Sequence, residues 1–141
     1  MNIFLDTSAL VAAFVDTHER HKFSHAWLNK ALHHVPLMGV HSIAEMFNSF
    51  CRIYSKVDYP VDEVRDVFEN ELKKFKKIVL EEEEYREVIC KLLHVGLKGS
   101  LIYDALLYQA ACKAKADVLI TLNAKDFLRF DWGKVKIVSP E

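Results

Sequence analysis

The 141-residue sequence is poor in residues that break or staple a chain, with four glycines, three prolines and three cysteines. So few glycines and prolines exclude a long linker or low-complexity segment, and one domain over residues 1–141 is expected. Cys51, Cys90 and Cys112 are far apart, odd in number and without a Cys-x-x-Cys motif. They predict free thiols that act as small core side chains, in a reducing cytoplasmic compartment.

A strong net charge and long apolar runs are also lacking. The formal net charge is −1, so any contact with nucleic acid must come from a local patch rather than from the global field. Asp6 interrupts the apolar N-terminal segment, and the run from Ala9 to Val15 is too short to span a bilayer. We therefore expect neither a signal peptide nor a membrane segment. The hydrophobic fraction of 51% is enough for one core.

Short apolar runs alternate along the chain with segments of helical periodicity. Strands are expected at residues 3–5, 37–40, 78–80, 118–121 and 135–138. Helices are expected at residues 8–15, 19–34, 42–54, 60–75, 82–95 and 101–114. Strands separated by helices imply parallel pairing with helices on both faces of the sheet. The pattern predicts a single-domain α/β fold, a three-layer α/β/α sandwich around a central, mostly parallel sheet.

Polar side chains from distant parts of the sequence should meet at one edge of this sheet, because ligands of open parallel sheets bind beyond the carboxyl ends of the strands. Asp6 directly follows the first strand, and Asn123 follows the fourth, with Asp126 one helical step later. Glu45 and Asp104 fall in early turns of helices that begin at this edge. Four of these five groups are carboxylates.

Asp104 is the most informative of the acids. It lies within SLIYDALLYQAAC, whose neighbours are nearly all apolar, which is typical of a buried helix. An ionised carboxylate buried without a partner costs several kcal/mol. A cluster of such acids is tolerable around a divalent cation, and carboxylate oxygens completed by water are the ligands of Mg²⁺ or Mn²⁺.

Each acid also has a structural alternative. Glu45 follows Ser42 at the spacing of a capping box, and an acid in a first helical turn suits the helix dipole. Asp6 could be an N-cap, Asp126 could cap a turn, and Asp104 could be a hydrogen-bonded core acid. These alternatives stay open for single acids but do not explain why all four fall at one edge.

The order of four short motifs resembles the PIN domain family, and within it the VapC-type toxin ribonucleases. The motifs are FLDTSAL, SIAEMFNSFCR, IYDALLYQAA and LITLNAKDF, and the likeness extends to the closing VKIVSPE. The resemblance implies an α/β/α sandwich and hydrolysis of RNA by an acidic cluster with Mg²⁺ or Mn²⁺. It also implies a small antitoxin partner of the VapB type and a homodimer.

By motif, the family's catalytic positions fall on Asp6, Glu45 and Asp104, with Asp6 and Asp104 as the metal ligands. Thr121 and Asn123 match the TxN or TxD element that closes the site. Many members carry aspartate where this chain has Asn123, and the acid is here displaced to Asp126, which we take as the fourth catalytic residue. A metal held in this way polarises the phosphoryl oxygen and activates water.

Residues beside the acids in the sequence are assigned to substrate binding. They are Thr7, Ser8, His41, Arg52, Thr121 and Asn123. Solvent exposure alone would also explain a surface arginine. Three further histidines at helical spacing could form a zinc site, but no fourth ligand is evident, and we interpret them as a solvated helix face: His18, His21 and His25.

Other functional classes fit the acids less well. A haloacid dehalogenase-like phosphohydrolase needs a second aspartate two residues after the first, where this chain has Ser8. A receiver domain needs an acidic pair before the strand-end aspartate, and this pair is missing. A PIN-like module that binds RNA or protein without cleavage remains the alternative to the nuclease, and metal-dependent cleavage discriminates between them.

Overall fold

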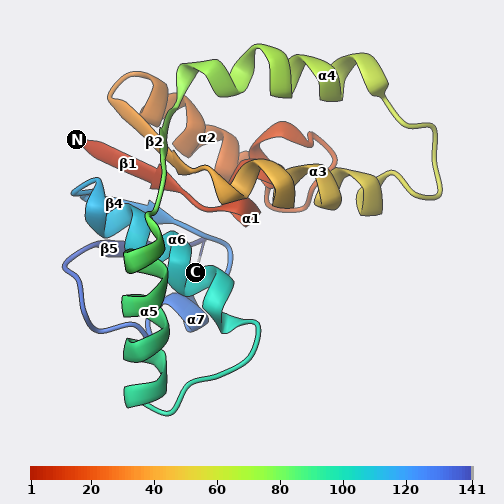
Figure 1. Cartoon of the computed structure of the whole chain (residues 1–141). Coiled ribbons are helices and arrows are strands. Elements are labelled where there is room, and N and C mark those ends of the chain that lie inside the picture. The colour runs from red at the N-terminus through yellow and green to blue at the C-terminus, as the bar shows by residue number, and fades with distance from the viewer. Residues whose placement is uncertain (141) are drawn as a thin grey trace.

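A computed structural model describes residues 1–140 (Figure 1). Glu141, the last residue of the predicted domain and of VKIVSPE, lies outside the described residues. Residues 1–140 form a five-stranded sheet of order β3-β2-β1-β4-β5 in which each pairing is parallel. Its strands are β1 (Asn2–Leu5), β2 (Val35–Gly39), β3 (Lys76–Ile78), β4 (Val118–Ile120) and β5 (Lys136–Val138).

Helices cover both faces of the sheet, which confirms the predicted α/β/α sandwich (Figure 1). One face carries α1 (Thr7–Phe14), α2 (His21–Leu32), α3 (His41–Ile53), α4 (Val61–Glu69) and the 3₁₀ turn η1 (Glu71–Lys74). The other face carries α5 (Glu82–His94), α6 (Leu101–Lys113) and α7 (Ala124–Phe127).

The two-residue period of the central strands divides the apolar side chains between two cores. In β1, Ile3 and Leu5 face the helices α1 to α4, whereas Phe4 faces α5 to α7. In β4, Leu119 shares the core of Phe4, and its neighbours Val118 and Ile120 share the other. Because both faces are buried, these strands are continuous apolar runs rather than alternating ones.

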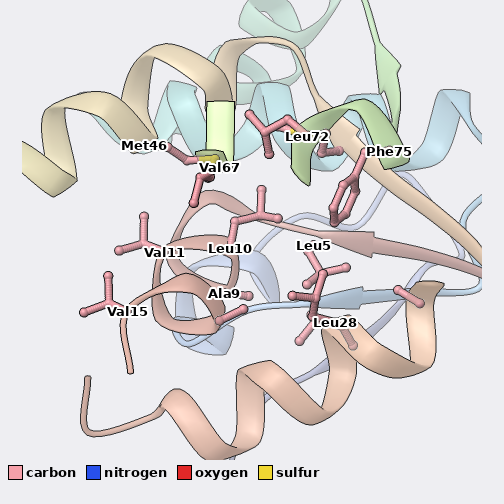
Figure 2. Close-up of a cluster of buried hydrophobic side chains, with 14 of the residues drawn as sticks. Leu5, Ala9, Leu10, Val11, Val15, Leu28, Met46, Val67, Leu72 and Phe75 are labelled. Atoms are coloured by element: carbon pink, nitrogen blue, oxygen red, sulfur yellow. The ribbon is translucent and has the colours of Figure 1, made fainter. Parts of the chain in front are cut away.

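Helix α1 lies inside the first of these cores. Its residues from Ala9 to Ala13 are all buried, which fits a helix that is apolar all round. Figure 2 shows Leu10 of this helix between Leu28 of α2 on one side and Met46 of α3 and Val67 of α4 on the other. This packing fixes the helix on several sides and so fixes the residues at its N-terminus.

The helix predicted over residues 60–75 is wrong in its extent. Helix α4 ends at Glu69, and η1 follows directly. Leu72 and Phe75 are nevertheless buried, as the apolar stripe suggested, and Figure 2 shows both in the core under α1 to α4. Leu72 lies within η1, and Phe75 follows it with extended backbone, so both reach this core without a continued α-helix.

The short helix α7 was not predicted, and the other elements match the predicted types, with ends that shift by one or two residues. Within residues 1–140, no helix has the length and apolar content needed to cross a membrane. The three cysteines are free thiols, as predicted. Cys51 and Cys112 are half-buried, but Cys90 is exposed, so the expectation of a core side chain is wrong for Cys90.

Candidate active site

Asp6 lies at the junction of β1 and α1, beyond the carboxyl end of the central strand. It is the N-cap of α1, and its Oδ1 accepts hydrogen bonds from the Ala9 amide at 2.9 Å and the Ser8 hydroxyl at 2.7 Å. Oδ2 accepts a third from the Thr121 hydroxyl at 2.6 Å. The capping alternative and the strand-end position therefore both hold for this side chain, which is only 3% exposed.

Thr7 joins the start of α1 to α3. Its hydroxyl donates to Oε1 of Glu45 at 2.7 Å and lies 2.8 Å from the hydroxyl of Ser42. Because a hydroxyl has a single proton to donate, Ser42 is the donor in the second contact. Thr7 thus aims the Glu45 carboxylate and is itself held by a fully buried serine.

The capping-box alternative for Glu45 is wrong. Helix α3 begins at His41 after an N-cap at Val40, and no side chain caps it. Glu45 therefore lies in the second turn, where it cannot satisfy free amides at the helix start. Its side chain is used in the contact with Thr7 instead. Helix capping therefore does not explain why an acid stands at position 45.

A second chain of contacts runs through the segment after β4. The Thr121 hydroxyl, which donates to Asp6, also accepts from the Asn123 amide at 2.9 Å. The Asn123 side-chain amide donates to Oδ2 of Asp126 at 2.6 Å. The Ser8 hydroxyl, in turn, accepts from the Leu122 amide at 3.1 Å. These bonds fix the loop after β4 to the start of α1.

Three of the four predicted acids line one cavity of about 490 Å³, together with Asn123 and Arg52. The acids are Asp6, Glu45 and Asp104, which come from β1, α3 and α6. The volume is in the range of ligand sites in proteins. Thr7 and Ser8 also line it, whereas Thr121 is buried behind Asp6.

The acids are short of positive charge. Burial raises the pKa of Asp6 from 3.8 to about 6, despite its three hydrogen bonds, and the charge of Glu45 adds to the shift. The pKa of Asp104 is also raised to about 6, first by burial and then by three negative neighbours, which are Asp6, Asp126 and Glu45. The site therefore favours a proton or a cation beside these carboxylates.

Besides Thr121, two predicted residues do not line this cavity. Asp126 lies behind Asn123, close enough for its charge to raise the pKa of Asp104, and its Oδ1 is 3.9 Å from a guanidinium nitrogen of Arg129. His41 lines a neighbouring apolar cavity, and its ring stacks on Tyr103 with centroids 5.7 Å apart.

Sequence reasoning missed some of the cavity wall. His18 lines the cavity from the loop between α1 and α2, although we interpreted it as part of a solvated helix face. Ser49 and Arg52 lie four and seven residues after Glu45, so they share its face of α3. That spacing could have identified Ser49, but the sequence of the loop carries no signal for His18.

A closed metal cage is absent from the described part of the chain, in which no three His, Cys, Asp or Glu side chains come together as ligands for one ion. The oxygen donors of the cavity are carboxylates from separate elements. One oxygen of Asp6 makes a single hydrogen bond. Such hard donors suit a divalent cation that keeps part of its water shell.

Comparison with solved structures shows the same fold throughout. A chain of the DNA-bound VapBC2 structure from Rickettsia felis aligns with a TM-score of 0.72 at 17% identity, covering 100% of both chains. Mycobacterium tuberculosis VapC20, described as a sarcin-ricin loop cleaving toxin, aligns at 0.68 with 14% identity, covering 95% of this chain and 98% of that one. A chain of DNA-bound VapBC from Salmonella typhimurium gives 0.70 at 15% identity, with 99% and 98% covered.

Identities of 14–17% show a shared fold but not the family, so the family rests on a comparison with family models. No curated protein matches the sequence. The PIN domain family does match, over residues 3–133. This range includes β1 to β4 and each of the four predicted acids. The chain belongs to the PIN domain family.

Proposed function

We propose that the chain is a metal-dependent endoribonuclease of the VapC type, the toxin of a toxin–antitoxin pair. The observation that carries this proposal is the cavity at the sheet edge, where Asp6, Glu45 and Asp104 meet and, within residues 1–140, none of the three forms an ion pair. The sarcin-ricin loop cleavage named for the VapC20 structure supports RNA as the substrate class. RNA of the cytoplasm is then the target.

Mg²⁺ or Mn²⁺ fits the donors of this site. Mg²⁺ is usually bound through one or two carboxylates, and waters and substrate phosphates complete its shell, so a three-ligand cage is not required. Asp6 and Asp104 would hold the ion, since burial and the charge of neighbouring carboxylates raise the pKa of both. When bound, the ion supplies positive charge against the scissile phosphate and activates water for attack.

Glu45 has the geometry of a base. One carboxylate oxygen is occupied by the Thr7 hydroxyl, which leaves the other free to accept the proton of an attacking water. The water oxygen forms a bond to phosphorus, and the bond from phosphorus to the ribose oxygen breaks in line with it. The released ribose oxygen becomes a hydroxyl by taking a proton from solvent.

Asn123 and Asp126 act as a pair in this proposal. Asn123 lines the cavity, and its amide is oriented by the carboxylate of Asp126. Asp126 contributes negative charge at Asp104 and so strengthens cation binding there. The two residues together replace the single aspartate that many family members carry. The substrate contacts we propose are Thr7, Ser8, Arg52 and Asn123, with His41 beside the cavity and Thr121 behind it.

A VapB-type antitoxin is the proposed partner, in line with the VapBC complexes that share this fold. We also propose a homodimer through α5, whose Tyr85, Ile89 and Leu93 form an exposed apolar stripe. The first turn of α5 is acidic and its last turn holds Lys91, so an antiparallel second copy would match both charge and apolar surface. Light scattering should give a dimer for the parent and a monomer for Leu93→Glu.

The test of the nuclease is incubation of the purified protein with a panel of cellular RNAs, with and without Mg²⁺ or Mn²⁺. Cleavage should require the metal and should be lost in Asp6→Asn and Asp104→Asn. Asp62→Asn, an exposed acid on α4, is the matched control and should cleave at the parent rate. RNA binding without metal-dependent cleavage would overturn the proposal in favour of a non-catalytic PIN module.

A further inference from the structure

Two nitrogen-containing side chains, His18 and Arg52, line the cavity away from β1. Arg52 is already a proposed substrate contact, whereas His18 has no role in the proposed chemistry. His18 comes from the loop between α1 and α2, and Arg52 from the last turn of α3. Both could contact RNA, but they would do so differently. One offers a ring N–H and the other a permanent positive charge.

The loop holds His18 in place through three hydrogen bonds. The His18 amide donates to the Val15 carbonyl at 3.0 Å, and the His18 carbonyl accepts from the His21 amide at 3.0 Å. The ring nitrogen Nδ1 accepts from the Arg20 amide at 3.0 Å. Because Nδ1 uses its lone pair in this contact, the ring proton is on Nε2. The half-buried ring thus has Nε2–H as its remaining donor.

Arg52 differs from three other arginines of this chain. Arg65, Arg86 and Arg129 each lie within 4 Å of a carboxylate oxygen. Over residues 1–140, Arg52 has no ion pair, and its Nη2 donates only to the neutral hydroxyl of Ser49 at 3.3 Å. Its charge is therefore available to an anion in a cavity whose other charged groups are acids.

The spacing along α3 sets the distance between Arg52 and the acids. Seven residues separate Glu45 from Arg52, which is about 10 Å along a helix axis. A stacked strand covers that length in about three nucleotides, at roughly 3.4 Å each. We propose that His18 and Arg52 form a phosphate-binding subsite that holds the RNA backbone beyond the acids. This inference rests on the proposed function for its substrate class.

Substitutions at His18 can separate the roles of the two ring nitrogens. In His18→Asn, Oδ1 can still accept from the Arg20 amide, but the Nε2–H donor is lost. In His18→Gln, the side-chain amide reaches the position of Nε2 and restores a donor. His25→Gln, an exposed histidine on α2, is the matched control, and Arg65→Gln is the control for Arg52→Gln.

Affinity for a fluorescein-labelled, single-stranded RNA oligonucleotide is measured by anisotropy in the Asp104→Asn background, so that the RNA stays intact. His18→Asn should weaken binding about fivefold, the effect of one hydrogen bond, and His18→Gln should recover most of it. Arg52→Gln should also weaken binding and should lower the salt slope of log K by about 0.7. The His18 variants should leave that slope unchanged, because a neutral donor releases no counterion.

Melting temperatures show that each variant is folded, and His18→Ala, which also lacks the Nε2–H donor, replaces His18→Asn in the test if that variant does not fold. Parent affinity in both His18→Asn and Arg52→Gln would overturn the subsite, and so would equal losses in the two control variants. This outcome is independent of the nuclease assignment. A parent protein that cleaves no RNA, but whose affinity depends on His18 and Arg52, would overturn the nuclease and leave the subsite standing.

Discussion

Two threonines do much of the positioning in the site. Thr7 and Thr121 each donate their single hydroxyl proton to an acid and each accept a bond from a second residue. Such a hydroxyl fixes a carboxylate without neutralising it. The carboxylates therefore keep a fixed orientation but gain no neutralising positive charge. Their raised pKa values make stability depend on pH, which can be measured.

The first prediction concerns the pH dependence of stability. The pKa of Asp104 is about 6 in the folded chain, above its ordinary value of 3.8, so the fold binds the proton more tightly than the unfolded chain does. Stability from this group is therefore present below about pH 4 and is lost as the pH rises to about 6. Asp104→Asn should be more stable than the parent by about 1 kcal/mol at pH 7, after allowing for solvent screening.

Urea denaturation of both proteins without metal, from pH 4 to pH 7, measures this difference. The gap between the two should widen with rising pH. A variant that is less stable than the parent across the whole range would instead support Asp104 as a hydrogen-bonded structural acid.

The second prediction separates positioning from catalysis at Glu45. Glutamine can still accept from Thr7, so Glu45→Gln should keep the melting temperature of the parent. It cannot take a proton from water, and cleavage should fall by at least about 100-fold. Thr7→Val, which removes both hydroxyl contacts, should instead cost about 1–3 kcal/mol of stability. Parent-rate cleavage by Glu45→Gln would reduce Glu45 to an anchor for Thr7.

The third prediction ranks the two residues after β4. Asp126→Asn removes a charge that acts on Asp104 and should lower kcat/KM about 10-fold or more, as loss of a supporting carboxylate does at metal sites. Asn123→Ala removes a neutral donor and should cost less. The reverse order in steady-state kinetics would make Asn123 the site residue and Asp126 its support.

At the scale of elements, α5 and α6 end in the same way with different residues. After α5, the Gly96 amide donates to the Leu93 carbonyl and the Leu97 amide to the Leu92 carbonyl, which is a Schellman motif with Gly96 at φ +74°. After α6, Lys115 and Ala116 repeat these bonds to Cys112 and Ala111, with Lys115 at φ +55°.

The fourth prediction uses this pair. Gly96→Ala should lower the free energy of unfolding by about 1 kcal/mol, because a Cβ is disfavoured at positive φ. Lys115→Gly should raise it by a few tenths to 1 kcal/mol for the same reason. Chemical denaturation measures both, and RNA cleavage should be unchanged. Equal shifts in one direction would show that backbone conformation does not decide these positions.

The elements also show what the sequence could and could not predict. Apolar periodicity predicted the sandwich, because each strand and helix must bury a defined set of side chains. The helix predicted over residues 82–95 ends beside Gly96, a residue type typical of helix ends, whereas Lys115 after α6 carries no such signal. The break between α4 and η1 was missed, because Leu72 and Phe75 are equally consistent with a continued helix.

The site followed from the sequence only in part. Strand-end positions and motif order brought Asp6, Glu45 and Asp104 together correctly. His18 was missed, because its place in the cavity depends on how a loop folds back rather than on periodicity. The capping alternative for Glu45 failed because the N-cap of α3 is Val40, two residues before the Ser42 that a capping box requires.

At the scale of the whole molecule, the fifth prediction is that a divalent cation stabilises the fold. Binding at 100 times the dissociation constant adds about 2.7 kcal/mol, which corresponds to several degrees in melting temperature. The rise should be seen in calorimetry with millimolar Mn²⁺ or Mg²⁺. It should be kept in Asp62→Asn and lost in Asp104→Asn. No shift in the parent protein would count against a metal site in the cavity.

The central position of β1 has a consequence for how the protein comes into being. Asp6 is made well before its partners: its amide donates to the Ile120 carbonyl, and its carboxylate accepts from the hydroxyl of Thr121, 115 residues later. At about 5–20 residues per second, a ribosome adds those residues in roughly 6–20 seconds. Until then, β1 cannot pair with β4, and Asp6 lacks its hydrogen bond from Thr121. For the proposed ribonuclease, a nascent chain therefore cannot complete its acidic site until β4 and Thr121 have been made.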